Sequence, residues 1–320
     1  MVTDGEKGFQ LRGSISIFIL AALLAAAGIL LPFVGVFPVL FLPLPMIVMR
    51  LENRETASAL ILAGVVLAVP LLFTGRISSD MLFYAGMLLF GFVIGEGWQQ
   101  GIHKETAVLR AILAVLGMVA LMIIVLAVTK SMGPVALIQN HVAANLAMTL
   151  EVYRHMEMPE ETLAVFEAAL PRLEYTLARL LPAISACILI LAAWLNLLAA
   201  RSMIRHRKIQ APDLGLFMNW GVPPLFIWGL ILAGLILMIP IPFVRILGLS
   251  CLLVMMPLYF LQGMAIVAYW FHHRGVPPLI RHALYALMLI QQILFLVVLV
   301  LGIFDTWLNF RNRIQTKPKP

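Results

Sequence analysis

The chain has 320 residues, of which 62% are hydrophobic and 12% are charged, and its formal net charge is +7. A soluble domain is closer to half apolar and a quarter charged, so this composition excludes an ordinary soluble protein. The apolar residues form blocks of about 20 residues, the length at which a helix crosses a bilayer. We therefore predict an all-α, polytopic bundle of transmembrane helices. Basic loops are typical of such a protein, so we expect the lipid bilayer as its partner and no nucleic acid.

The apolar blocks predict about nine spans. In chain order they lie near Ile15–Leu31, Phe33–Met49, Ala57–Phe73, Met81–Gly95, Ala107–Val128, Pro182–Ile204, Pro223–Ile239, Phe243–Phe271 and Arg281–Phe304. The second block contains Pro38, Pro43 and Pro45, and each proline removes a backbone hydrogen bond from a helix. We interpret this block either as a kinked span or as a re-entrant segment, which leaves eight spans.

Basic residues next to the spans predict the orientation of the bundle. The densest cluster is Arg201, Arg205, Arg207 and Lys208, and such clusters stay on the cytoplasmic side. Alternating spans then place the N-terminal tail in the cytoplasm and the bundle in the cytoplasmic (inner) membrane. The same alternation puts the basic C-terminal tail outside, against the rule, so the side of the C-terminus stays open.

Composition divides the chain into five parts. They are a cytoplasmic tail (1–14), N-terminal membrane helices (15–129), a polar hairpin (130–181), C-terminal membrane helices (182–305) and an interfacial tail (306–320).

The predicted hairpin is amphipathic, because its apolar residues recur every three or four positions and so share one helix face. One stripe comprises Leu163, Phe166, Leu170, Leu173, Leu177 and Leu180, and an earlier one comprises Ile138, Val142, Leu146 and Tyr153. Pro171 is expected to kink the later helix. This extracytoplasmic hairpin either packs on the membrane surface or on the ends of the bundle, or it forms a lid over a substrate cavity.

The first predicted span carries small residues at four-residue spacing, Ala21 with Ala25 and Ala22 with Ala26. Small faces let helices approach closely, whereas leucine-rich faces pack against lipid. These four alanines, the alanine face, predict a close helix neighbour, either inside the chain or from another subunit.

Residues that perform chemistry are scarce in this sequence. The centres of the predicted spans hold almost no charge, although proton- and sodium-driven carriers need one there. The sequence contains no phosphate-binding loop and no common metalloprotease, dithiol or serine-hydrolase motif. We therefore predict no catalytic residue, no metal, no cofactor and no enzyme activity. The alternative is an enzyme acting on lipid, which would have to combine Glu96 and Asp305 with His103 or His141.

Four side chains are candidates for substrate binding: Glu96, Asn219, Trp220 and Gln262. Glu96 is interpreted either as part of a helix end, paired with Lys104, or as a carboxylate at the mouth of a cavity. The other three serve either in hydrogen bonds between helices or in contact with a ligand, because a buried amide in a membrane protein needs partners. Gln262 is the best placed, since apolar residues flank it on both sides.

Three segments carry a resemblance to a known family: NWGVPPLFIW (Asn219–Trp228), YFLQGMAIVAYW (Tyr259–Trp270) and GIFDTWLNFR (Gly302–Arg311). In this order they resemble the YybS-like family of uncharacterised bacterial membrane proteins, a domain of unknown function. That family is distantly similar to the substrate-binding S components of energy-coupling-factor transporters. In S components an Ala-x-x-x-Ala face on the first helix docks a membrane coupling subunit, so the resemblance gives the alanine face that role.

The resemblance implies a substrate-binding or transport subunit for an unknown small molecule, energised by a separate membrane coupling subunit and ATPase. The lack of a phosphate-binding loop in the sequence agrees with an energy source outside the chain. The alternative is a structural or interaction protein of the cell envelope without transport activity, whose hairpin docks a partner.

Overall fold

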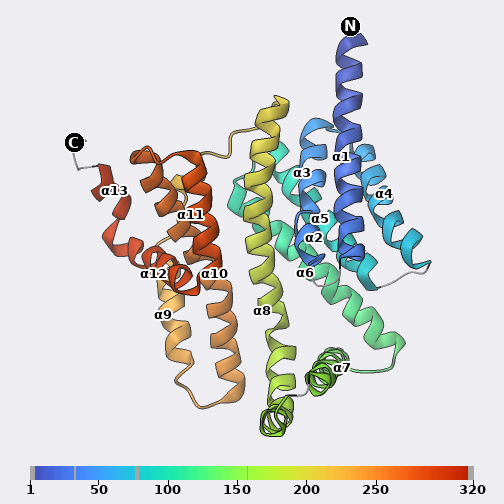
Figure 1. Cartoon of the computed structure of the whole chain (residues 1–320), viewed down its shortest axis with the longest axis vertical. Coiled ribbons are helices and arrows are strands. Elements are labelled where there is room, and N and C mark those ends of the chain that lie inside the picture. The colour runs from blue at the N-terminus through green and yellow to red at the C-terminus, as the bar shows by residue number, and fades with distance from the viewer. Residues whose placement is uncertain (1–3, 32–33, 76–78, 157, 316–320) are drawn as a thin grey trace. The chain divides into compact units, whose positions relative to one another are not determined.

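The structure is a computed structural model that describes residues 4–31, 34–75, 79–156 and 158–315. Throughout these ranges the regular structure is helical, as the composition predicts (Figure 1). The chain divides into two compact units. Unit 1 comprises Met1–Leu126 and Ile188–Leu214, and unit 2 comprises Ala127–Cys187 and Gly215–Pro320. This division differs from the five parts drawn from composition, because one long helix contributes to both units.

Five helices in the described chain are long and apolar enough to cross a membrane. They are α4 (Thr56–Thr74), α5 (Ser79–Gln99), α6 (Lys104–Thr129), α8 (Glu160–Arg207) and α10 (Pro242–His273). A sixth candidate is the pair α11 (Pro278–Ile290) and α12 (Gln292–Leu308), which is bent by 98° at its break. The apolar stretches of α1 (Asp4–Leu30) and α9 (Phe226–Ile236) are shorter. The structure thus shows a helical membrane protein, and it does not confirm nine spans.

In unit 1 the predicted second span is broken into α2 (Val36–Leu40) and α3 (Pro43–Glu52). Pro43 begins α3, at the helix position where its missing N–H leaves no helical hydrogen bond unmade. α3 is buried along most of its length and packs on α5. The two helices approach closely, because a Cβ at Gly91 would lie 2.6 Å from the Pro43 carbonyl oxygen. The structure therefore has a broken segment here instead of a straight span.

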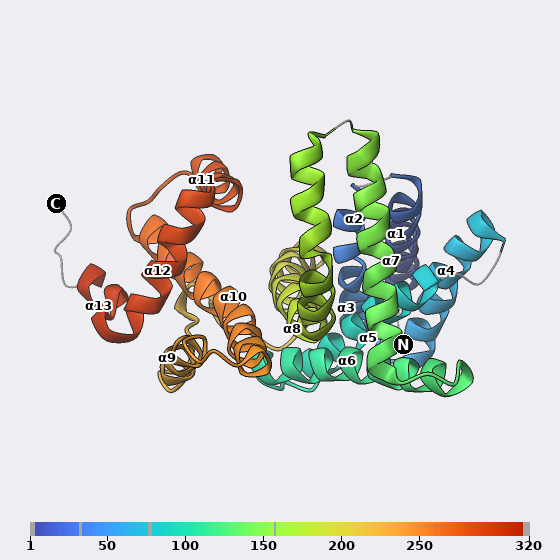
Figure 2. The same ribbon diagram turned by 90° about the horizontal axis from the view of Figure 1, so that it is seen from below.

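Unit 2 contains a helical hairpin formed by α7 (Pro134–His155) and the start of α8. Figure 2 shows these two segments side by side. The Tyr153 and Phe166 rings meet edge to face with centroids 5.4 Å apart, and Arg154 pairs with Glu167 at 2.5 Å. One residue from each predicted apolar stripe, Tyr153 and Phe166, therefore lies at the pairing of the two helices.

α8 is one continuous helix of 48 residues that contains both Pro171 and Pro182. The boundary predicted at residue 182 between the hairpin and the sixth span is therefore not a helix end. A proline removes one hydrogen bond from a helix, and neighbouring turns hold a long helix together across that loss. At about 1.5 Å per residue, α8 measures about 72 Å along its axis, more than twice the thickness of a bilayer core.

The remainder of unit 2 packs around a close crossing of α10 and α12. A Cβ at Gly263 would overlap the Val298 carbonyl oxygen, and a Cβ at Gly302 would overlap the Tyr259 carbonyl oxygen. Only glycine therefore allows the two backbones to approach so closely. The short helices η1 (Phe217–Asn219) and α13 (Phe310–Gln315) lie against α10 beside this crossing.

Candidate functional site

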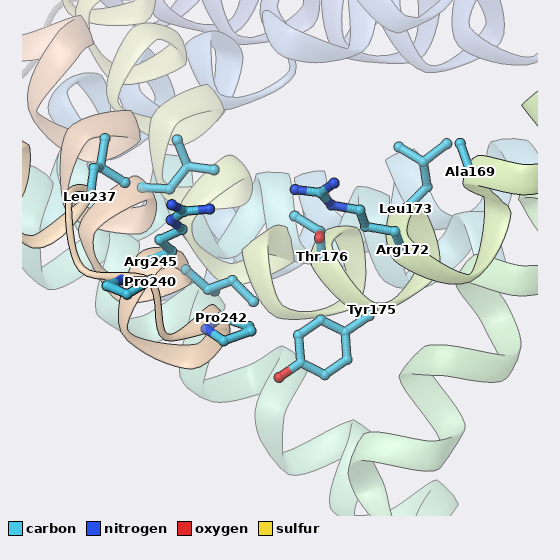
Figure 3. Close-up of a pocket in the computed structure, with 11 residues that line it drawn as sticks. Ala169, Arg172, Leu173, Tyr175, Thr176, Leu237, Pro240, Pro242 and Arg245 are labelled. Carbon is cyan, nitrogen blue, oxygen red and sulfur yellow. The ribbon is translucent and has the colours of Figure 1, made fainter. Parts of the chain in front are cut away.

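Unit 2 contains a cavity of about 710 Å³ between α8 and the connection from α9 to α10 (Figure 3). Most of its wall is apolar, and four side chains bring polar atoms to it. The lining residues are Ala169, Arg172, Leu173, Tyr175 and Thr176 from α8, and Leu237, Pro240, Pro242, Arg245, Ile246 and Leu249 from the other wall. We call this space the arginine cavity.

The two arginines of this cavity face each other. In Figure 3 the Arg172 side chain extends from α8 toward α10, and the Arg245 guanidinium turns into the same space. None of the eleven described lining residues is acidic. Neither guanidinium has a hydrogen-bond or ion-pair partner among the described residues. Both arginines are exposed to solvent, so the space is an open pocket with a largely apolar wall. Two like charges at such a pocket create a local positive potential, which attracts anions.

The local sequence explains how each arginine reaches the cavity. Pro242 is the first residue of α10, so Arg245 lies in the first turn of that helix, where no acidic residue is present. Arg172 directly follows Pro171 inside α8, within the segment predicted as the second half of the hairpin. That segment therefore supplies one wall of the cavity.

A second polar group in unit 2 joins three segments through Gln262, which is 3% exposed, and Asp305, which is 8% exposed. The Gln262 Nε2 donates to Asp305 Oδ2 at 3.1 Å, and the Gln262 Oε1 accepts from the Val222 N–H at 2.9 Å. The other oxygen, Asp305 Oδ1, accepts from the Phe310 N–H at 2.9 Å. The two side chains thus satisfy each other and two backbone donors, which is the structural role expected of a buried amide.

Asn219 and Trp220 join the same region through their main chains. The Arg311 guanidinium donates to the Asn219 carbonyl at 3.0 Å and to the Trp220 carbonyl at 2.5 Å. Burial lowers the pKa of Arg311, and the charges of Asp305 and Tyr269 oppose that shift. Three of the four predicted substrate-binding residues are therefore brought together, and the contacts they make there are within the protein.

Glu96 lies in unit 1, apart from that group. It pairs with Arg50, which is only 3% exposed, and it also accepts from the Gln100 amide at 2.7 Å. Glu96 was expected to pair with Lys104 or to lie at a cavity mouth; in the structure its ion pair is with Arg50, whereas the Lys104 Nζ donates to the Leu214 carbonyl at 2.9 Å and lies 3.7 Å from Glu105. The reason is the close packing of α3 on α5, which places Arg50 beside Gly95 and hence beside the carboxylate.

A smaller cavity of about 200 Å³ lies in unit 1 near Trp98. Of its three charged residues, Arg201 and Asp213 lie 3.9 Å apart, and Arg205 is the third. The Trp98 Nε1 donates to the Pro212 carbonyl at 2.8 Å, so the indole ring forms part of the wall. This cavity offers a ligand little space and fewer free charges than the arginine cavity.

The alanine face is divided between the interior of unit 1 and its surface. Ala21 and Ala25 are fully buried, and the Tyr84 hydroxyl donates to the Ala25 carbonyl at 3.0 Å. Helices α2, α3 and α4 of the same chain pack against α1. Ala22 and Ala26 are half-buried. The chain itself thus supplies a close neighbour for one side of this face.

Sequence reasoning did not identify Arg172 and Arg245 as site residues. The available signal was the position of Arg245 in the apolar segment IPIPFVRILGL (Ile239–Leu249). A charged side chain in such a segment is energetically unfavourable and usually marks a functional site. In the described part of the chain, no group of three or more His, Cys, Asp or Glu side chains is placed to hold a metal ion.

Comparison with known proteins identifies one family. No curated protein matches the chain, and no solved structure does. A family model described as "Predicted membrane protein (DUF2232)" matches residues 19–306, which is most of the chain and includes both walls of the arginine cavity. The function of this family is not defined by its description. The chain belongs to this family of membrane proteins with a domain of unknown function.

Proposed function

We propose that the chain is the substrate-binding subunit of a bacterial inner-membrane transport system, energised by a separate coupling subunit and ATPase. The observation that carries this proposal is the arginine cavity. Its volume of about 710 Å³ falls within the range of about 300–1,000 Å³ that is typical of small-molecule sites. The resemblance to the YybS-like family and to S components supports the same role. In this proposal the N-terminus is cytoplasmic and the hairpin is extracytoplasmic.

The outward side of α1 is the surface that a coupling subunit would use. Ala21 and Ala25 are covered by the chain's own helices, which leaves the half-buried Ala22 and Ala26 beside the exposed Leu23. A helix of another subunit can approach closely only where side chains are small. A large side chain at Ala22 should therefore block the partner and leave the arginine cavity unchanged, because α1 belongs to the other unit.

Affinity purification from native membranes in a mild detergent tests this proposal. We expect an ATPase and a membrane subunit to co-purify with the wild-type chain and to be lost from Ala22→Trp. The matched control is Leu60→Trp on α4, at a side chain that is 68% exposed. If no ATPase accompanies the wild-type chain, the transport role is abandoned in favour of an envelope protein without transport activity.

A further inference from the structure

We propose that the arginine cavity binds the phosphate monoester group of an amphiphilic molecule. The phosphate lies between Arg172 and Arg245, and the apolar body lies along Leu173, Ile246 and Leu249. This inference rests on the proposed function, because it names the substrate class of the same cavity. The same chemistry is offered by a lipid phosphate of the membrane and by a soluble phosphorylated metabolite with an apolar body.

The charge of the cavity matches a phosphate monoester better than a carboxylate. Arg172 and Arg245 together contribute two positive charges, and no acidic residue lines the described wall. A phosphate monoester carries about −1.5 to −2 charges near neutral pH, whereas a carboxylate carries one. Each guanidinium also presents a planar fork of N–H donors that fits two phosphate oxygens. Two forks facing one space can therefore engage one phosphate from both sides.

The position of Arg245 on its helix also favours an anion. The first turn of a helix carries a partial positive charge, so a cation there is unfavourable unless an anion lies nearby. Arg245 lies in the first turn of α10, which contains no acidic residue. The Thr176 hydroxyl, which lies beside Arg172 in Figure 3, adds another donor to the same wall of the cavity. An anion at this place thus meets two guanidinium groups and a helix N-terminus together.

The remaining wall explains why the ligand has an apolar part. Leu173 comes from α8, while Ile246 and Leu249 come from α10, and Pro240 and Pro242 close the side next to Arg245. The volume of about 710 Å³ lies within the range of about 300–1,000 Å³ of small-molecule sites, and the wall away from the arginines is largely apolar, which suits an apolar body. Burying such a body contributes about 25 cal/mol per Å² of apolar surface.

Lipid retention by the purified full chain tests the proposal. The protein is reconstituted in nanodiscs of phosphatidylcholine that contain equal amounts of phosphatidic acid, a monoester, and phosphatidylglycerol, a diester. It is then extracted in neutral detergent, and the retained lipids are quantified by native mass spectrometry. A parallel titration measures the binding of 1-naphthyl phosphate, a soluble monoester, and of inorganic phosphate. The variants are Arg172→Gln, Arg245→Gln and Arg172→Lys, and Arg274→Gln at the opposite end of α10 is the control.

The wild-type chain should retain phosphatidic acid or bind naphthyl phosphate at least tenfold better than the diester or inorganic phosphate. Each glutamine variant should lose about tenfold or more in affinity, as expected for charge-assisted hydrogen bonds. Arg172→Lys should lose less, and Arg274→Gln should bind like the wild type. Retention of phosphatidic acid alone identifies a membrane source, and binding of naphthyl phosphate alone identifies a soluble one.

The proposal is overturned if neither monoester binds better than the diester and inorganic phosphate. It is also overturned if Arg274→Gln weakens binding as much as the cavity variants do. These outcomes are separate from those of the co-purification. Monoester binding without an ATPase removes the transport role and keeps the site, whereas an ATPase without monoester binding keeps the transport role and removes this ligand.

Discussion

At the scale of single residues, Gln262 connects the most segments. It joins the Val222 backbone to Asp305, and it is 3% exposed. In Gln262→Ala a buried N–H and a buried carboxylate oxygen both lose a partner, and each such loss costs about 1–3 kcal/mol. We expect the free energy of unfolding of the detergent-purified protein to fall by about 3 kcal/mol. The control is Gln292→Ala, an exposed glutamine on α12, and equal losses for the two variants would contradict the prediction.

A second residue-scale prediction concerns the ion pair of unit 1. Glu96→Ala leaves the buried Arg50 without its carboxylate, and such a loss costs about 3–5 kcal/mol when both partners are buried. The Glu96 side chain is 33% exposed, so we expect a smaller cost of about 2 kcal/mol, read as a lower melting temperature. Adding Arg50→Met to the Glu96→Ala variant should recover part of the lost stability, because no unpaired buried charge then remains. A larger loss of melting temperature for Lys104→Met than for Glu96→Ala would contradict this prediction.

The sequence predicted the burial of Gln262 correctly, whereas Asn219, which was expected inside the bundle, is exposed, and the contacts of both were not predictable. Gln262 stood out because apolar residues surround it, and it is buried. Its partner Asp305 lies in another helix, and local spacing does not report distances between segments that are far apart along the chain. The same holds for Arg172 and Arg245. They lie in different helices, so only the packing of α8 and α10 shows that they line one cavity. Asn219 and Trp220 contribute main-chain carbonyls, for which no side-chain pattern exists.

At the scale of elements, the crossing of α10 and α12 depends on two glycines. A Cβ at Gly302 would overlap the Tyr259 carbonyl oxygen, so Gly302→Ala forces the helices apart. We expect this variant to unfold at a clearly lower temperature and to yield less folded protein. The control is Gly234→Ala on α9, where no atom lies within 4 Å of the added Cβ and alanine favours the helix. A normal melting temperature for Gly302→Ala would show that the crossing tolerates separation.

The elements themselves were predictable where an apolar block stands alone between charges, as for α4, α5 and α6. Their ends were harder to predict where proline occurs, because proline can begin, kink or break a helix. The sequence GVPPL occurs at Gly221–Leu225 and again at Gly275–Leu279. Pro278 of the second copy begins α11, as a first-turn proline should. In the first copy, α9 begins only at Phe226, after a turn that follows Pro223. Pro182 begins no helix, since α8 passes through it. Packing with other segments decides between these outcomes, and sequence spacing does not describe that packing.

At the scale of the whole molecule, we predict that α13 lies on the cytoplasmic side of the membrane. Arg311 binds the carbonyls of Asn219 and Trp220, so α13 lies beside the segment that precedes α9. That segment follows the basic cluster of Arg201–Lys208 after a short linker, and basic clusters stay in the cytoplasm. The bent pair of α11 and α12 agrees with this placement if it enters the membrane and returns to the same side. The basic tail then obeys the positive-inside rule.

Cysteine labelling in whole cells tests this orientation. In a chain that carries Cys187→Ala and Cys251→Ala, single cysteines are introduced as Lys130→Cys at the end of α6, as Ser202→Cys near the end of α8, and as a cysteine added after the last residue. We expect a membrane-impermeant maleimide to label Lys130→Cys in intact cells, because the loop before α7 is predicted to be extracytoplasmic. The other two cysteines should react only after the cells are permeabilised, because both lie on the side of the basic cluster. Labelling of the added cysteine in intact cells would mean that the pair of α11 and α12 crosses the bilayer and that the tail departs from the positive-inside rule.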